Sequence, residues 1–167
     1  MKSLLWPVAL LAISAFAKAD PAWRARVAPE SEPGERLVIR GRVLQAQGGP
    51  AAAGTRIFVY QTDAKGIYGP GQGSPASISR LRAEFTVGPN GEYEIVTIRP
   101  GHYPGGGVPA HIHLNLIEGG KPTRQVAEFF FAGDKYLRGG EQGFVLQLRK
   151  DAQGRWQGSQ DFALGDK

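Results

Sequence analysis

The chain has 167 residues, no cysteine, and 20 basic against 15 acidic residues, for a formal net charge of +5 at pH 7. This length suits one domain with a real hydrophobic core, and the lack of cysteine excludes a disulfide framework. The charges are scattered without a basic run, which argues against nucleic-acid binding.

The N-terminus has the features of a secretory signal peptide, which we assign to residues 1–19. Lys2 gives a positive start, residues 4–16 are apolar, and residues 17–19 form a small-residue cleavage site. The apolar run is shorter than the ~20 residues that span a bilayer, so an uncleaved anchor is the less favoured alternative. We expect cleavage after Ala19, export to the periplasm or the cell exterior, and no membrane attachment afterwards.

Residues 20–35 contain three prolines and mixed charges, which predict an extended, loosely ordered leader, with order beginning near Arg36. Beyond that point, short runs of β-formers alternate with Gly/Pro turns, and no window of twelve or more residues has a helical period. We expect strands at residues 37–44, 55–63, 83–87, 92–99, 111–117, 124–131, 143–150 and 155–162. Residues 36–167 are therefore predicted to be all-β, a single β-sandwich of about eight short strands.

Histidines cluster after the strand at residues 92–99. All three histidines of the chain lie within twelve residues, which favours a metal or catalytic site over a polar surface. His111 and His113 share one face of a strand, and Ile112 points to the other face, where it can be buried. His102 would face away from its neighbour Tyr103 and is expected to be a bystander.

Two long loops, residues 64–80 and 100–109, carry Tyr68 and Tyr103. Long loops in compact β-domains are usually functional. Two phenolates with two neutral imidazoles form a hard, anionic ligand set, which favours Fe(III) over metals that prefer soft ligands. The residues alone leave open that both tyrosines merely pack in their loops. A structural zinc site is disfavoured, because zinc normally takes cysteine, histidine and carboxylate ligands.

Four segments together resemble the intradiol ring-cleavage dioxygenases, the catechol and protocatechuate 3,4-dioxygenase group. They follow the family's order and similar spacing over about residues 40–137, and they read VYQTDAKGIY (59–68), GPNGEYEIVTIRPGHYP (88–104), PAHIHLNL (109–116) and FFFAGDKYL (129–137). Any one segment would be weak, but the combination is specific.

The resemblance implies a non-haem Fe(III) bound by Tyr68, Tyr103, His111 and His113, with a catechol-type compound and O₂ as reactants. It further implies that the substrate takes the place of Tyr103, which then serves as a base. The ring opens between its two hydroxylated carbons to a muconate-type diacid, and the metal acts as Lewis acid and template.

Two residues depart from the family's pattern. Val108 replaces the arginine of R-P-A-H-I-H, and Glu128 stands where the family has glutamine. Both are expected near the substrate ring, and together with Tyr103 they are the residues to which we assign catalytic roles. Changes beside metal ligands cost ~10–100-fold in affinity or activity. A carboxylated ring would need a cationic partner, for which Arg80, Arg82 and Arg99 are the nearest in sequence.

The competing hypothesis is an exported β-sandwich binding module that keeps a metal site without turnover. The complete set of two tyrosines and two histidines favours the enzyme, because a binding module has no need to keep all four. The identity of the substrate and the oligomeric state do not follow from the sequence.

Overall fold

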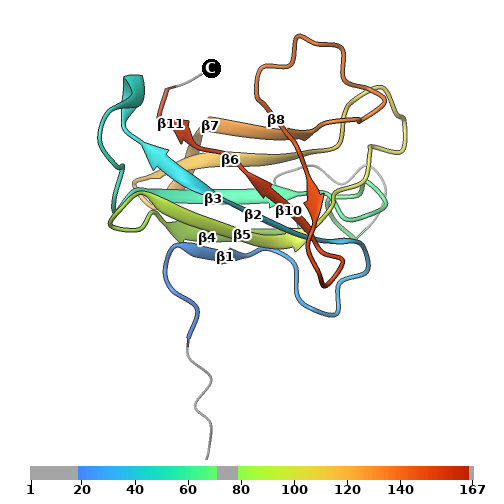
Figure 1. The fold of residues 1–167 in the computed structure, drawn as a ribbon, viewed down its shortest axis with the longest axis horizontal. Coiled ribbons are helices and arrows are strands. Elements are labelled where there is room, and N and C mark those ends of the chain that lie inside the picture. The colour runs from blue at the N-terminus through green and yellow to red at the C-terminus, as the bar shows by residue number, and fades with distance from the viewer. Residues whose placement is uncertain (1–18, 71–78, 166–167) are drawn as a thin grey trace, which may run out of the picture.

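In the computed structural model, which describes residues 19–70 and 79–165, the chain is built from two layers of β-strands (Figure 1). The strands are β1 (Arg24–Arg26), β2 (Arg36–Leu44), β3 (Arg56–Gln61), β4 (Leu81–Thr86), β5 (Glu92–Ile98), β6 (His111–Glu118), β7 (Lys121–Phe131), β8 (Phe144–Leu146), β9 (Arg149–Lys150), β10 (Trp156–Ser159) and β11 (Phe162–Ala163). A short 3-10 turn, η1 (Ala46–Gly48), follows β2. The predicted all-β sandwich is confirmed.

The described strands form two sheets. The first has the order β1-β5-β2-β10-β9, with β11 pairing to β2 off this path, and the second has the order β4-β3-β6-β7-β8. Within the first sheet, β2 and β5 are antiparallel, whereas β10 runs parallel to β2 with Trp156 opposite Leu37. The expected strand at residues 143–150 is divided into β8 and β9, which belong to different sheets.

The hydrophobic core lies between the inner faces of the two sheets. Tyr93 of β5 links them, because its ring centroid is 5.6 Å from that of Phe85 on β4 and 6.4 Å from that of Phe129 on β7. Burying each such side chain stabilises the fold by about 1.5–3 kcal/mol. Both sheets contribute residues with no exposed surface, among them Leu37, Ile39, Ile57, Val59, Ile95, Ile112 and Leu114.

The segment before Arg36 is more ordered than its sequence indicates. β1 pairs in parallel with β5, with Ala25 opposite Ile95, and Ala25 is 1 % exposed. Glu32 is also buried and accepts hydrogen bonds from the Arg80 guanidinium at 2.6 and 2.7 Å. The expectation of a loosely ordered leader is therefore wrong. A three-residue strand that pairs with a partner far along the chain leaves no local pattern to detect.

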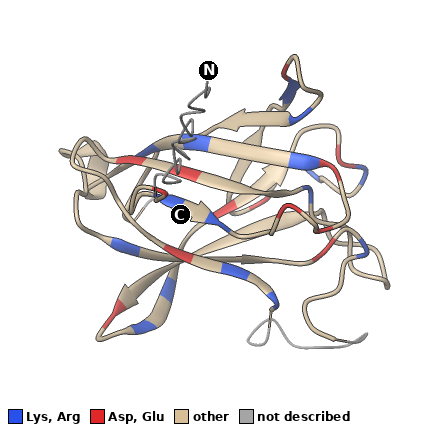
Figure 2. Ribbon diagram, turned by 90° about the horizontal axis from the view of Figure 1, so that it is seen from below, with Lys and Arg blue, Asp and Glu red and all other residues tan. Residues whose placement is uncertain are grey.

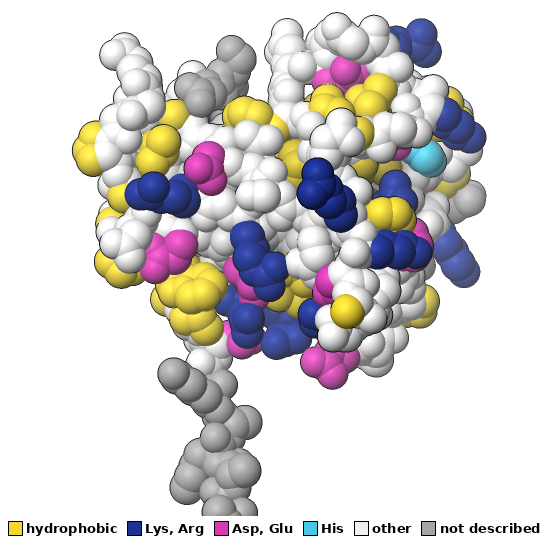
Figure 3. All heavy atoms as spheres, in the orientation of Figure 1, with side chains coloured by type: hydrophobic (Ala, Val, Ile, Leu, Met, Phe, Trp, Pro, Cys, Tyr) yellow, Lys and Arg dark blue, Asp and Glu magenta, His cyan; other side chains and the backbone are white. Residues whose placement is uncertain are grey.

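Charged residues are spread over strands and turns (Figure 2; Figure 3). On the outer face of the first sheet, the buried carboxylate of Glu94 pairs with Arg24 and, at 2.5 Å, with Arg40. No helix in the described part of the chain is long and apolar enough to cross a membrane. Residues 1–18 of the expected signal peptide lie outside the described residues.

Candidate metal centre

The outward face of the second sheet carries both candidate histidine ligands. On β6, Ile112 is fully buried on the core side, whereas the rings of His111 and His113 lie 4.5 Å apart, as the alternation predicts. Tyr60 of β3 is directly opposite His113 on one side, and Glu128 of β7 is opposite it on the other. Directly opposite residues share a face of the sheet. Tyr60, His113 and Glu128 therefore form a row across three strands, with Tyr60 stacked on His113 at 4.6 Å and 18°.

A tight turn after β3 delivers Tyr68 to this face. The Asp63 carboxylate accepts the backbone N–H groups of Lys65 at 2.8 Å and Ile67 at 3.1 Å, which fixes the turn. Asp63 also pairs with Arg80 at 3.1 Å. Tyr68 follows directly and is only 7 % exposed.

The turn before Tyr68 packs against the loop that carries Tyr103. At Gly66, which has φ +80°, an added Cβ would lie 1.7 Å from the carbonyl oxygen of His102. Only glycine allows both this backbone conformation and so close an approach. The two tyrosine-bearing loops are thereby held in direct contact, and the rings of Tyr68 and Tyr103 lie 5.8 Å apart.

Four side-chain donor atoms meet in one hydrogen-bonded chain. Tyr68 Oη is 3.0 Å from His113 Nε2 and 2.8 Å from Tyr103 Oη, and Tyr103 Oη is 3.0 Å from His111 Nε2. Donor atoms bound to one metal at ~2 Å lie about 3 Å from one another. The structure thus brings together the four side chains that the sequence analysis assigned as iron ligands.

The number of protons available for these hydrogen bonds indicates that a cation belongs among the four donor atoms. His111 Nδ1 is 2.7 Å from the carbonyl oxygen of Pro109, which can only accept, so Nδ1 carries the proton and Nε2 offers a lone pair. His113 Nδ1 faces the Glu128 carboxylate at 3.0 Å, and the same assignment follows. The two tyrosine hydroxyls then supply only two protons, although the four donor atoms make three short contacts. One contact is therefore left without a proton. A cation bound by the lone pairs of all four atoms would remove the need for that proton, so the donor set suits a bound metal.

Burial controls the protonation of these groups. It raises the pKa of Tyr68, as does the hydrogen bond with Tyr103, and it raises the pKa of Tyr103. It lowers the pKa of His111, which favours the neutral imidazole. Both phenols are therefore protonated in the metal-free protein. A bound cation reverses this preference, because it stabilises phenolate directly.

Glu128 fixes the orientation of His113. Burial alone would raise the pKa of Glu128, but the hydrogen bond from His113 and the nearness of both imidazoles lower it. Gln125 shares the His113 Nδ1 proton at 3.3 Å. A carboxylate on the Nδ1 side holds a histidine with Nε2 aimed at the metal.

Glu128 also offers a second ligand set with the two histidines, since one donor atom of each lies within 4.8 Å of the others. Its oxygen is 3.8 Å from His111 Nε2. However, it is on the Nδ1 side of His113, away from the nitrogen that faces Tyr68. The four-atom set of two phenols and two Nε2 atoms is therefore the better metal site.

Asp134, which was not among the predicted site residues, connects the segments that carry Tyr103 and His111. Its Oδ2 atom is 2.8 Å from His102 Nε2 and accepts the N–H of Ala110 at 3.0 Å. Its side chain is 2 % exposed. His102 does not join the donor atoms, but its bond to Asp134 holds the Tyr103 loop beside the start of β6.

The remaining residues considered in the sequence lie outside the hydrogen-bonded cluster. Val108 is 39 % exposed on the loop before His111. Arg80 is occupied by Glu32 and Asp63. Arg99 lies over the rings of Phe131 and Trp156. Arg82 is opposite Tyr60 on β4.

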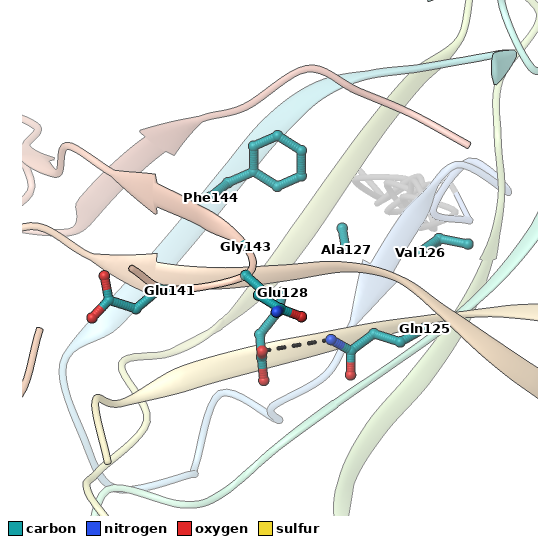
Figure 4. Close-up of a pocket in the computed structure, with 8 residues that line it drawn as sticks. Gln125, Val126, Ala127, Glu128, Glu141, Gly143 and Phe144 are labelled. Atoms are coloured by element: carbon teal, nitrogen blue, oxygen red, sulfur yellow. Dashed lines mark hydrogen bonds between the residues drawn. The ribbon is translucent and has the colours of Figure 1, made fainter. Parts of the chain in front are cut away.

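A cleft of about 550 Å³ opens beside Glu128, between β7 and the segment that leads into β8. Gly143 lies against it, and an added Cβ there would be 2.6 Å from the carbonyl oxygen of Glu128. Figure 4 shows the Glu128 and Gln125 side chains directed toward each other, with the Phe144 ring on the other side of the β7 ribbon. The cleft is lined by Gln125, Val126, Ala127, Glu128, Glu141, Gln142, Gly143 and Phe144.

A family model described as "Dioxygenase" matches residues 15–155, most of the chain. The chain belongs to this dioxygenase family. The resemblance to the intradiol ring-cleavage enzymes is thereby confirmed. A protocatechuate 3,4-dioxygenase beta chain from Burkholderia cepacia is 34 % identical over 113 residues, which cover 62 % of this chain and 48 % of that protein.

A hydroxyquinol 1,2-dioxygenase from Rhizobium sp. (strain MTP-10005) is 31 % identical over 121 residues, which cover 63 % of this chain and 40 % of that protein. The chain thus spans less than half the length of these two curated relatives. The dioxygenase domain of a dioxygenase carbohydrate-binding protein fusion from Streptomyces sp. SirexAA-E has a TM-score of 0.64 and 23 % identity. The superposition covers 92 % of this chain and 94 % of that chain, and it shows that the two proteins share a fold.

Proposed function

We propose that this chain is an intradiol dioxygenase that binds one Fe(III) through Tyr68, Tyr103, His111 and His113 and cleaves a catechol-type ring. The observation that carries the proposal is the chain of four donor atoms with neighbouring contacts of 2.8–3.0 Å. Membership of the dioxygenase family supports it. Catechol and O₂ combine into a muconate-type diacid that keeps both oxygen atoms, so the reaction needs no further oxidant or reductant.

A bound ferric ion supplies Lewis acidity and a template on which the reactants meet. Tyr103 is the donor suited to give way to the substrate. It is more exposed than Tyr68, and the glycines at 105–107 follow it in its loop. Burial raises the pKa of Tyr103, so a phenolate released from the metal there would take the proton of a catechol hydroxyl at Oη.

The other residues hold the site in place. Pro109 and Glu128 accept the Nδ1 protons of His111 and His113, which keeps both Nε2 lone pairs directed inward. Tyr60 stacks on one face of the His113 ring and covers that face. Tyr68, the more buried of the two phenols, would be one of the residues that keep holding the metal.

We further propose that the protein acts after export, because an apolar run and a small-residue cleavage site precede Asp20. An exported enzyme of this kind would meet catechol-type compounds outside the cytoplasm.

The deciding experiment is a visible spectrum of the purified protein loaded with ferric iron, followed by catechol without oxygen and then by oxygen. We expect a reddish phenolate-to-iron absorption, a change of that spectrum on adding catechol, and then oxygen consumption with formation of a diacid. Zinc-loaded protein is the colourless control. A ferric protein that stays colourless and ignores catechol would leave only the binding-module alternative.

A further inference from the structure

The charge that lies closest to the candidate metal centre is negative. The Glu128 oxygen is 3.0 Å from His113 Nδ1 and 3.8 Å from His111 Nε2, and its side chain is 17 % exposed. Its carboxylate accepts the His113 proton, as an ionised carboxylate does.

No cation within the described residues balances this carboxylate at the centre. Among the described residues, no lysine or arginine forms a hydrogen bond or an ion pair with Tyr60, with Glu128 or with the four donor residues. Arg80 is bound by two carboxylates, and the loop before His111 presents the uncharged Val108. The other carboxylate at the cleft, Glu141, accepts the N–H groups of Arg138 and Gly139 within its own loop.

Arg82 is the cation that could compete. It lies on the same sheet face, at the opposite end of the row from Glu128, with Tyr60 and His113 between them. Neighbouring strands are about 4.8 Å apart, so the Arg82 backbone is about 10 Å from that of His113. Arg82 is also exposed, and water screens its charge. Glu128, in direct contact with His113 and largely buried, therefore dominates the field at the centre.

From this asymmetry we propose that the site selects catechols whose ring substituent is cationic, such as an aminoalkyl group, over catechols whose substituent is a carboxylate. The proposal rests on the proposed function of the same site. A ring bound by its hydroxyls at the donor atoms projects its substituent into a surrounding in which Glu128 is the nearest fixed charge. An ammonium group there gains a partner, whereas a carboxylate meets a like charge.

The test compares three catechols that differ mainly in charge: 3,4-dihydroxybenzylamine, 4-methylcatechol and 3,4-dihydroxybenzoate. Binding to the ferric protein is measured without oxygen by calorimetry, and kcat/KM is measured with oxygen. A single charge at about 6 Å in a partly screened site changes affinity by about tenfold. We expect the amine to bind most tightly and the benzoate most weakly, with about a tenfold difference between neighbouring members.

Three variants assign the effect to its source. Glu128→Gln should reduce the preference for amine over benzoate by about tenfold or more. Arg82→Gln should change it by less than about threefold, as expected for an exposed charge. Glu84→Gln is the matched control, because it removes an exposed carboxylate from β4 while leaving Glu128 in place.

The outcomes separate this inference from the proposed function. Failure of the uncharged 4-methylcatechol to bind or react would overturn the proposed function, and the inference with it. Two results would overturn the inference alone, provided that 4-methylcatechol reacts normally. One is that 3,4-dihydroxybenzoate binds as tightly as 3,4-dihydroxybenzylamine. The other is that Glu128→Gln leaves the preference for the amine over the benzoate unchanged. Val108→Arg, at an exposed position, adds a reciprocal test, in which benzoate binding should improve.

Discussion

Asp134 and His102 are joined by a contact of 2.8 Å between Oδ2 and Nε2, although neither is a candidate metal ligand. The same carboxylate accepts the Ala110 N–H next to His111. It therefore sets the distance between the Tyr103 loop and the start of β6. Loss of the Asp134 carboxylate should therefore loosen both Tyr103 and His111 without removing either donor atom.

The first prediction concerns the bridge that Asp134 forms. Asp134→Asn should lower the affinity for Fe(III) by about 10–100-fold, the usual cost of losing a group that positions ligands. At saturating iron the visible band should persist, because all four donors remain. Iron titration followed by absorbance measures both quantities. Asp151→Asn, in a turn far along the chain, is the control, and an equal loss in both variants would refute a specific role for Asp134.

The second prediction concerns the tyrosines. Tyr68→Phe and Tyr103→Phe each remove one phenolate while nearly preserving shape, so each should shift or bleach the visible band of the ferric protein. Tyr60→Phe should leave the band in place, since Tyr60 stacks on His113 without joining the donor atoms. A band that survives in both Tyr68→Phe and Tyr103→Phe would show that the iron is bound elsewhere.

The third prediction concerns His111, which is 7 % exposed and contributes its Nε2 atom. His111→Ala should lose most of the bound iron, measured by metal analysis after dialysis. The control is Lys121→Ala, because Lys121 is an exposed residue at the start of β7 and makes no contact with the donor atoms or with the bridge between Asp134 and His102. Full retention of iron by His111→Ala would contradict the four-ligand site.

The fourth prediction concerns the two departures from the family's pattern. The double change Val108→Arg with Glu128→Gln should alter kcat/KM for simple catechols by about tenfold or more, because it moves the local charge by two units. Steady-state oxygen uptake measures the change. Unaltered rates and an unaltered substrate range would remove the roles assigned to these two residues.

The fifth prediction concerns acid stability. Burial alone would raise the pKa of Asp63, but the N–H groups of Ile67 and Lys65 and the Arg80 guanidinium lower it below its ordinary value. The resulting stabilisation is present above the unfolded pKa of about 3.9 and is lost as the pH falls through the folded pKa. Asp63→Asn should therefore unfold more easily at pH 7 and show a weaker dependence on pH below about 4. Urea unfolding of the metal-free protein measures this, with the exposed Glu118→Gln as control.

Export gives a further expectation. The exported protein should begin near Asp20, whose carboxylate pairs with Arg24 at 2.8 Å. N-terminal sequencing of exported material measures the processing. Recovery of an intact Met1 would refute cleavage after Ala19.

Local pattern was sufficient for the placement of His111 and His113, because alternation along a strand is a property of neighbouring residues. The roles of Tyr60 and Asp134 could not be predicted in this way. Tyr60 reaches His113 only through the register between β3 and β6, and Asp134 reaches His102 only because two distant loops meet. Neither relationship leaves a trace in the order of the residues.

The charge of the site illustrates the same limit. Glu128 was recognised as a departure from a family pattern, but its contact with His113 depends on the pairing of β6 with β7. Likewise, Arg80 was considered as a partner for a carboxylated substrate. The structure shows that Glu32, in the segment expected to be loosely ordered, already binds it.

The parallel pairing of β10 with β2 has a consequence for how this chain folds. Trp156 is opposite Leu37, so one edge of the first sheet cannot form until the chain has been made at least as far as β10. β1 similarly cannot pair until β5 has been made. Contacts between such distant segments slow folding, because the intervening chain must lose much of its freedom first. A nascent chain of this kind therefore stays unfolded for longer than a chain whose strands pair with their neighbours in sequence.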